Sequence, residues 1–360
     1  MFGQRLRLAR RKAGLSMRDL AGRLSPAVSA QAISKYEGGR MMPSSAVLVD
    51  LARRLDVSLD FLMGGQVEAL DGIEFRKHSG TSAKDRARAE AIVTEALEDY
   101  LAIEDILEIE PSVDPLAGLR CVRIGSFDEV EKKACELREH WNLGTDPIPS
   151  VTGLLEAHGI KVIEADLPAR FDGLACGVQR SGNRADTNVV VTSRRTNVER
   201  KRLTLAHELA HRVIRGTSHP AIKVEKAMQR FAGAFLVPAE HLRVEVGAHR
   251  HGITYRELMR LKHFYGVSAT AMLIRLRDVG ILAPATIEYA FRTYARSWRT
   301  REPEQITEEE GLGAFEKPSR FEQLVWRALG DELISTVRAA QLLKRSRNDV
   351  EREIRGPRER

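Results

Sequence analysis

A short motif near the middle of the chain, His207-Glu208-Leu209-Ala210-His211, sets narrow limits on the fold around it. The flanking residues have apolar helical spacing, so both histidines project from one face of a helix and can reach a single Zn²⁺. A catalytic zinc takes three protein ligands and leaves one position for water, so a third donor must come from elsewhere in the chain. Glu208 would lie beside that water, where it can act as a general base.

The cysteines exclude other zinc and disulfide arrangements. Cys121, Cys135 and Cys176 are widely spaced and form no CxxC pair, so neither a disulfide framework nor a Cys-rich zinc cluster is available. Any metal must therefore be held by histidines and carboxylates. Cys176 lies in a predicted strand near the motif, where a buried structural thiol is the ordinary interpretation and metal or redox chemistry the alternative.

The hydropathy pattern excludes a membrane protein. Charged residues make up 30% of the chain, and no apolar run approaches the roughly 18 residues that a spanning helix needs. The N-terminus enters a charged amphipathic pattern without the apolar stretch of a secretory signal, which predicts a cytoplasmic protein with no membrane partner.

Charge is distributed unevenly along the first third of the chain. Residues 1–66 hold eleven Lys and Arg against five Asp and Glu, which favours a polyanionic partner. Residues 67–116 hold five Lys and Arg against thirteen Asp and Glu, and from Glu90 to Asp114 there are nine acidic residues and no basic one. Such a run is typical of a solvated helix face; the alternative is an internal mimic of nucleic acid that competes for the basic head.

The basic segment has the pattern of five short helices between Gln4 and Met63. Ser16 with Asp19 forms a capping pair, and Ser29 can cap a third helix. This is the pattern of a helix-turn-helix module. The stretches 31–38 (QAISKYEG) and 57–62 (VSLDFL) resemble the Xre/Cro-repressor family of DNA-binding domains, which implies an all-α DNA-binding head.

The third helix of such a module enters the major groove, where glutamine can pair with adenine through two hydrogen bonds. Gln31, Ser34 and Lys35 are the candidates for contacts with base edges, and Arg18 and Arg40 for contacts with phosphates. The alternative for each is an ordinary exposed residue. Because one module covers only a half-site, we expect a homodimer on a double-stranded operator.

The stretch around the zinc motif, residues 197–238, resembles the ImmA/IrrE family of zinc metallopeptidases. The segment 200–208 (RKRLTLAHE) is the most specific part, and the likeness extends from about residue 149 to residue 282. The resemblance implies that Glu225, six residues before Phe231, completes a zinc site with His207 and His211. It also implies a substrate class, since this family is associated with the cleavage of helix-turn-helix repressors.

Strand signals at residues 160–164, 173–178 and 188–192 predict a small sheet packed on the motif helix. The expected fold is multidomain: an all-α head, an α+β zincin-like metallopeptidase domain and a helical C-terminal region. The expected segments are the head 1–66, an acidic helical connector 67–120 with a loop at His78 to Ser82, the metallopeptidase domain with a helical bundle 121–283, a linker 284–318, C-terminal helices 319–345 and a disordered tail 346–360.

Two functions remain open. The first is a cytoplasmic transcriptional regulator with zinc-dependent endopeptidase activity, which cleaves a helix-turn-helix repressor, its own head included, in response to stress. In this hypothesis Asn188 to Thr192 is an edge strand that holds the substrate extended. The second is a non-catalytic repressor or antitoxin in which the zinc domain senses or binds a partner. Zinc content, and proteolysis compared between wild type and Glu208→Gln, distinguish the two.

Overall fold

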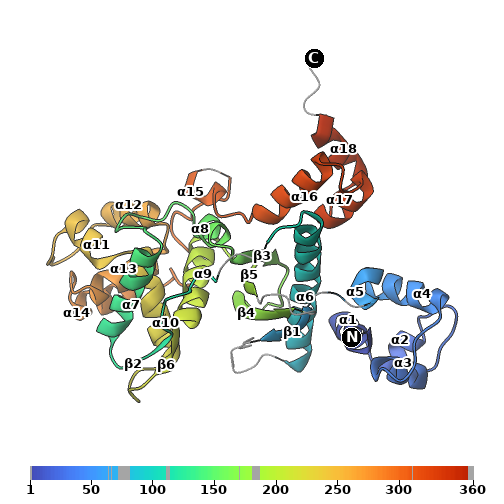
Figure 1. Ribbon diagram of the computed structural model, residues 1–360. Helices are drawn as coiled ribbons and strands as arrows, with labels where there is room; N and C mark the ends of the chain where they lie inside the picture. Colours follow the sequence, from blue (N-terminus) through green and yellow to red (C-terminus); the bar gives the residue numbers. More distant parts are fainter. Residues whose placement is uncertain are drawn as a thin grey trace.

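The computed structural model describes residues 2–63, 65, 67–71, 82–110, 114–169, 171–180, 187–309 and 311–355 (Figure 1). Of the loop predicted at His78 to Ser82, residues 78–81 lie outside the described residues. The elements are α1 (Phe2–Lys12), α2 (Met17–Ala21), α3 (Ala30–Glu37), α4 (Ser45–Leu55), α5 (Leu59–Met63), β1 (Val67–Asp71), α6 (Ala83–Ile106), β2 (Val122–Ile124), α7 (Phe127–His140), α8 (Val151–Ala157), β3 (Lys161–Ala165), β4 (Gly173–Arg180), β5 (Thr187–Ser193), α9 (Val198–Val213), β6 (Ile214–Thr217), α10 (Val224–Leu236), α11 (Ala239–Val246), α12 (Tyr255–Tyr265), α13 (Ala269–Asp278), α14 (Pro284–Arg292), α15 (Gly311–Ala314), α16 (Arg320–Gly330), α17 (Thr336–Leu343) and α18 (Arg347–Arg355).

The head consists of α1 to α5 around a core of its own, as its pattern predicts. The Ser16 side chain accepts a hydrogen bond from the Asp19 N–H and Asp19 returns one to Ser16, which starts α2 with a full capping box. Ser29 caps α3 in the same way through the Ala32 N–H. Apolar residues of all five helices form the core, among them Leu6, Leu20, Ile33, Leu51 and Leu62.

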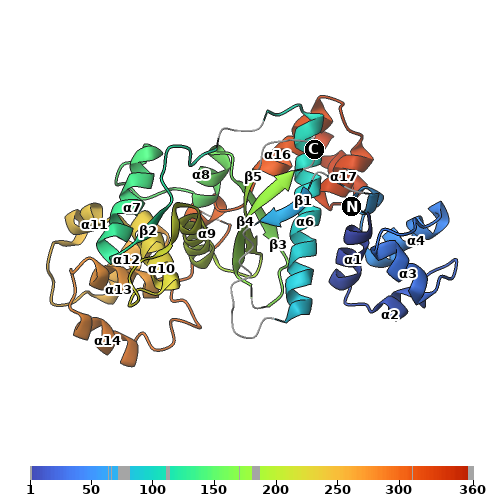
Figure 2. The ribbon, with the colours of Figure 1, turned by 60° about the horizontal axis from the view of Figure 1, so that its bottom comes forward.

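The four-stranded sheet has the order β1-β4-β5-β3, with β3 parallel to β5 and the other pairs antiparallel. Successive residues of a strand point to opposite faces: Val190 packs with the core around α9, whereas Val189 and Val191 pack with α6. The sheet therefore lies between α9 and α6 (Figures 1 and 2).

The expectation that residues 188–192 form an edge strand is wrong. Strand β5 lies between β4 and β3. It pairs antiparallel with β4 on one side and parallel with β3 on the other. Strand β1, which the strand signals did not reveal, pairs with the far side of β4.

The segment 67–120, expected as a connector, contributes both β1 and α6 to the sheet unit. One stripe of α6, with Val93, Leu97 and Leu101, packs on the sheet, while Tyr100 and Ile103 pack against the C-terminal helices. The head contacts α6 mainly through α1. As a result, the head lies at one end of the molecule and the helices α7 and α10 to α14 at the other, with the sheet, α8 and α9 between them (Figure 2).

The C-terminal third is more ordered than its charged composition predicts. Within the expected linker 284–318 lie α14, α15 and the buried residues Ile287 and Trp298. Most of the tail expected to be disordered forms α18, because Val350 is buried in the core shared by α6 and α16 to α18; residues 356–360 lie outside the described chain. None of the described helices is long and apolar enough to cross a membrane.

Candidate metal centre

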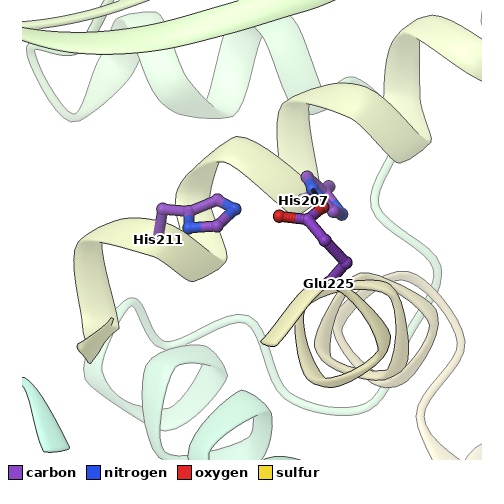
Figure 3. Close-up of side chains that lie close together, drawn as sticks. All are labelled: His207, His211 and Glu225. Atoms are coloured by element: carbon purple, nitrogen blue, oxygen red, sulfur yellow. Dashed lines mark ion pairs between the residues drawn. The ribbon is translucent and has the colours of Figure 1, made fainter. Parts of the chain in front are cut away.

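Helix α9 carries the two histidines of the motif on one face. Its N-terminus is capped by Asn197, whose side chain accepts a hydrogen bond from the Arg200 N–H. The i to i+4 spacing brings the rings of His207 and His211 to a centroid separation of 5.3 Å. Both side chains project towards Glu225 (Figure 3), and the predicted helix is confirmed.

Glu225 reaches the histidines from the first turn of α10. Its Oε2 lies 3.5 Å from Nε2 of His207, and one ligand atom from each of His207, His211 and Glu225 falls within 4.8 Å of the others. The position of α10 is fixed by its buried face, where Met228 and Phe231 pack in the same core as α9.

The donor set fits a zinc ion. Two imidazole nitrogens and one carboxylate oxygen are ligands that catalytic zinc sites use, and two ligands of a tetrahedral zinc lie about 3.4 Å apart. The separation of 3.5 Å between His207 Nε2 and Glu225 Oε2 agrees with that spacing. The Glu225 side chain is 53% exposed, so this side of the cluster is open to solvent.

A cleft of about 490 Å³ adjoins this centre. His207, Glu208 and Glu225 lie in its wall, together with the start of β4 on one side and Trp298 on another. Glu208 is only 7% exposed and is the residue next to a ligand, so its carboxylate is held at the cleft with little access to bulk water. A molecule bound in this cleft would therefore lie next to His207, Glu225 and the Glu208 carboxylate.

The wall formed by β4 depends on a close approach at Gly173. A Cβ at this position would lie 2.5 Å from Cγ2 of Thr204 in α9 and 2.8 Å from the carbonyl oxygen of Val191. Only glycine permits such a contact without a shift of the backbone.

Buried charges tie the N-terminal half of α9 to a later segment, residues 302–309 and 311–316, which we call the strap. The carboxylate of Glu199 accepts a hydrogen bond from the Ile306 N–H at 2.9 Å. Arg202 pairs with Glu316, and both side chains are fully buried. Burial lowers the pKa of Arg202, and the adjacent Glu316 carboxylate opposes that shift.

Glu316 also connects the strap to α8. Its carboxylate accepts hydrogen bonds from the N–H groups of Val151 at 2.8 Å and Thr152 at 3.0 Å, at the start of that helix. The strap thus fixes two elements of the metallopeptidase domain. Sequence reasoning missed it because a buried acid in a charged, glycine-containing stretch has no local signal that separates it from a solvated one.

The candidate DNA contacts lie on the head and are accessible. Gln31, Ser34 and Lys35 on α3 are exposed, as are Arg18 in α2 and Arg40 after α3. Helix α6 packs on α1, and its acidic residues pair there with Arg5 and Lys12. The acidic run therefore docks the head without covering these five side chains.

Cys176 is not among the three described residues that cluster at the candidate metal centre. It is buried with the residues of the sheet that pack against α6, and this burial raises the pKa of its thiol to about 12. Cys176 is therefore buried, as the ordinary interpretation expects.

A helical DNA-reading head and a sheet domain with a His-His-Glu cluster define a DNA-binding protein that contains a metallopeptidase-type domain. Comparison with known families agrees with this class: residues 1–61 match a helix-turn-helix domain and residues 155–277 match the IrrE N-terminal-like domain. The chain thus carries a helix-turn-helix DNA-binding domain and an IrrE-type metallopeptidase domain. No curated protein matches it.

Proposed function

We propose that this chain is a cytoplasmic transcriptional regulator that binds a double-stranded operator as a homodimer and also acts as a zinc-dependent endopeptidase on a helix-turn-helix regulator. The observation that carries the proposal is the convergence of His207, His211 and Glu225, with His207, Glu225 and the adjacent Glu208 in the wall of one cleft. The presence of a DNA-reading head in the same chain supports the choice of substrate class.

The proposed chemistry is hydrolysis of a peptide bond. His207, His211 and Glu225 would hold the zinc, which when bound polarises a carbonyl group and lowers the pKa of water. Glu208 accepts a proton from the attacking water while the oxygen of that water bonds to the carbonyl carbon. The same residue then delivers the proton to the leaving amine as the C–N bond breaks.

The first half of β4 offers a place for an extended substrate. Strand β1 pairs with β4 only between Gly177 and Arg180, so among the described residues no strand covers that edge of β4 from Gly173 to Cys176. Gly173 and Leu174 lie in the cleft wall. A peptide segment could therefore add to this edge by main-chain hydrogen bonds.

The geometry of β1 supports the chain's own connector as one substrate. Because β1 is antiparallel to β4, with Asp71 opposite Gly177, the chain at Asp71 runs towards the end of β4 that lines the cleft. Covalent linkage raises the effective concentration of any such segment at the site. Cleavage between residues 64 and 120 would separate the head from the peptidase.

The test is intact-mass measurement over time with zinc added, for wild type and Glu208→Gln, each alone and mixed with helix-turn-helix regulators encoded nearby. We expect a cut that depends on Glu208, either between residues 64 and 120 or in the added regulator. Glu208→Gln keeps the three metal ligands and therefore serves as the matched control. Absence of any cut, with normal operator binding, would favour a non-catalytic repressor or antitoxin.

A further inference from the structure

The three C-terminal helices α16, α17 and α18 form a unit that neither matched domain covers. Helix α17 packs on both of its neighbours, and α16 packs on α6. Leu324, Ala340 and Val350, one from each helix, are buried in a core that the unit shares with α6. The matched domains cover residues 1–61 and 155–277, and the proposed peptidase chemistry uses no residue of this unit.

A tight turn joins α17 to α18. Only residues 344–346 lie between the two helices. Lys344 has a φ of 54° and ends α17 in the left-handed conformation. The Ser346 side chain accepts a hydrogen bond from the Asp349 N–H at 3.1 Å, which starts α18. Two short helices joined by a turn of about three or four residues and packed on a third helix are the arrangement of a helix-turn-helix module.

The outward side of α18 carries one amide and two guanidinium groups. Val350 points into the core, so the residues on the opposite side of this helix are Asn348, Arg352 and Arg355, at i, i+4 and i+7. All three are exposed. We call these three residues the α18 face.

The two arginines of the α18 face are available to a ligand. Arg352 lies 3.5 Å from the Asp349 carboxylate, and Arg355 lies 3.9 Å from that of Glu351. The arginine side chains are 76% and 67% exposed, and ion pairs between exposed groups stabilise little, so a phosphate or a base edge can replace either carboxylate. Residues 336–355 as a whole hold six Lys and Arg against three Asp and Glu, which favours a polyanion.

We propose that α17 and α18 form a second helix-turn-helix module, whose α18 face binds double-stranded DNA in the major groove. That groove admits an α-helix, and in it asparagine can pair with adenine and arginine with guanine, each through two hydrogen bonds. Residues 331–355 contain no aromatic side chain, so the module has no ring on which an unpaired base could stack, which disfavours a single strand. The α18 face has no apolar residue either, whereas the centre of a protein interface is apolar.

The two DNA-reading modules would contact different stretches of a duplex. Arg338 and Gln341 of α17 line a cavity of about 930 Å³ together with Arg53 of α4 and Phe61 of α5, so the C-terminal unit is a neighbour of the head. Helix α18 lies at the upper tip of that unit, and α3 lies at the lower side of the head (Figure 1). Recognition by both modules would therefore extend beyond the half-site that α3 covers, and it does not depend on peptidase activity.

The experiment measures binding of the full chain to duplexes of about 40 base pairs that the wild type selects from a random pool, a length that leaves room on both sides of a half-site. Binding by the head is first reduced with Gln31→Ala, Lys35→Ala. We expect this variant to retain salt-dependent duplex binding, and we expect the added change Asn348→Ala, Arg352→Ala to weaken that binding about tenfold or more. A single strand of the same sequence should compete poorly. With the head unchanged, Asn348→Ala, Arg352→Ala should remove the base preference outside the half-sites.

A matched control removes the same types of side chain from positions off the α18 face. Gln341→Ala, Arg347→Ala deletes one amide and one guanidinium group from the same unit; both residues are exposed, and Arg347 pairs with Glu351 at 2.7 Å. This control should bind duplex within about twofold of its parent. Equal affinity and equal base preference with and without Asn348→Ala, Arg352→Ala, whichever head the chain carries, would overturn the proposal. So would an equal loss in the matched control, which would reduce the effect to general charge.

Discussion

At the scale of single residues, Glu225 decides whether the two histidines become a metal site. Its carboxylate is the candidate ligand that the motif itself does not supply, and it comes from a different helix. We therefore predict that purified wild type contains about one zinc per chain and that His207→Ala or Glu225→Ala loses stoichiometric zinc. Metal analysis by mass spectrometry after dialysis measures this directly.

Glu208→Gln is the matched control for the measurement of zinc content. The side chain is nearly isosteric and is not among the three clustered ligands, so zinc should remain while proteolysis is lost. Full zinc occupancy in Glu225→Ala would refute the ligand assignment, whereas loss of zinc in Glu208→Gln would show that Glu208 holds the metal.

Glu316 is the residue on which the position of the strap depends. It is fully buried, pairs with Arg202 and accepts two main-chain hydrogen bonds from α8. Replacing it by alanine would leave a buried guanidinium without its counter-charge, so we expect a loss of about 3 to 5 kcal/mol in the free energy of unfolding of this domain. Urea denaturation followed by tryptophan fluorescence measures the loss.

The matched control for that prediction breaks an exposed ion pair. Arg327 and Asp331 are 60% and 55% exposed at their side chains, so Arg327→Ala should change the free energy of unfolding by about 0.5 kcal/mol or less. If Glu316→Ala were as mild as Arg327→Ala, the strap would not be a structural part of the domain.

Asp99 gives α6 a pH dependence. Its pKa is raised from 3.8 to about 6: burial is the main cause, Glu95 and Glu98 add to the rise, and Lys344 and Arg338 oppose it. The folded state therefore binds a proton more tightly than the unfolded chain, so stability falls as pH rises from about 4 to about 6 and stays lower above that range. Asp99→Asn should remove this fall and raise the free energy of unfolding at pH 7 by about 2 kcal/mol.

The measurement for Asp99 is urea denaturation at about pH 4.5 and pH 7 for both proteins, with Asp105→Asn as a control. Asp105 lies on the same helix and pairs with Arg180 at 3.3 Å, so its removal should not stabilise the protein. A fall of equal size between the two pH values in Asp99→Asn and in wild type would contradict the assignment.

At the scale of elements, α6 joins three parts of the molecule through three separate stripes. Its acidic stripe holds the head, because Glu98 pairs with Arg5 and Glu95 pairs with Lys12 of α1. Two acids of the charge run, Glu95 and Glu98, therefore dock one helix of the head, whereas Glu104 and Asp105 pair with Lys161 and Arg180 of the sheet. Its apolar stripes account for the contacts with the sheet and with α16 to α18.

The two ion pairs with α1 predict how charge removal affects the head. In Glu95→Gln, Glu98→Gln the head should detach from α6, so the radius of gyration measured by small-angle scattering should increase at moderate salt. Affinity for operator DNA should stay within about twofold of wild type, because the candidate DNA contacts on α3 are exposed in the docked state. A large gain in operator affinity would instead revive the hypothesis of a nucleic-acid mimic.

At the scale of the whole molecule, the head and the cleft lie apart in one chain, so we expect the proposed DNA binding and proteolysis to be altered by separate substitutions. We predict that wild type protects two half-sites of a pseudo-palindrome and that its affinity falls steeply with salt. Gln31→Ala should weaken binding by about 1 to 3 kcal/mol and relax the base preference at one position of each half-site.

The measurement is footprinting and titration on DNA selected from a random pool, with zinc binding recorded for the same protein. Arg347→Ala on α18 serves as a control, since this arginine is exposed and distant from the head in sequence. An unchanged footprint and affinity in Gln31→Ala together with Lys35→Ala would mean that another surface reads the operator.

Local sequence patterns determined the elements that the functional sites rest on. Helical spacing placed His207 and His211 on one face, and the pair Ser16 and Asp19 started α2, because both effects act within one or two turns. Strand patterns are also local, which explains why the three strands between residue 160 and residue 193 were predicted from the sequence. Glu225 was reached only through the resemblance to the ImmA/IrrE family, since residues on two different helices leave no common period in the sequence.

Only the tertiary structure decided the order of the strands, the place of β1, the role of the acidic run and the course of the strap. Each depends on a partner distant in sequence: β1 on β4, Glu98 on Arg5, and Glu316 on Arg202. A glutamate has the same local pattern whether it is solvated or paired inside the protein. What separates the two states is the free energy of burial and pairing, and that is fixed only when the chain has brought the partner into contact.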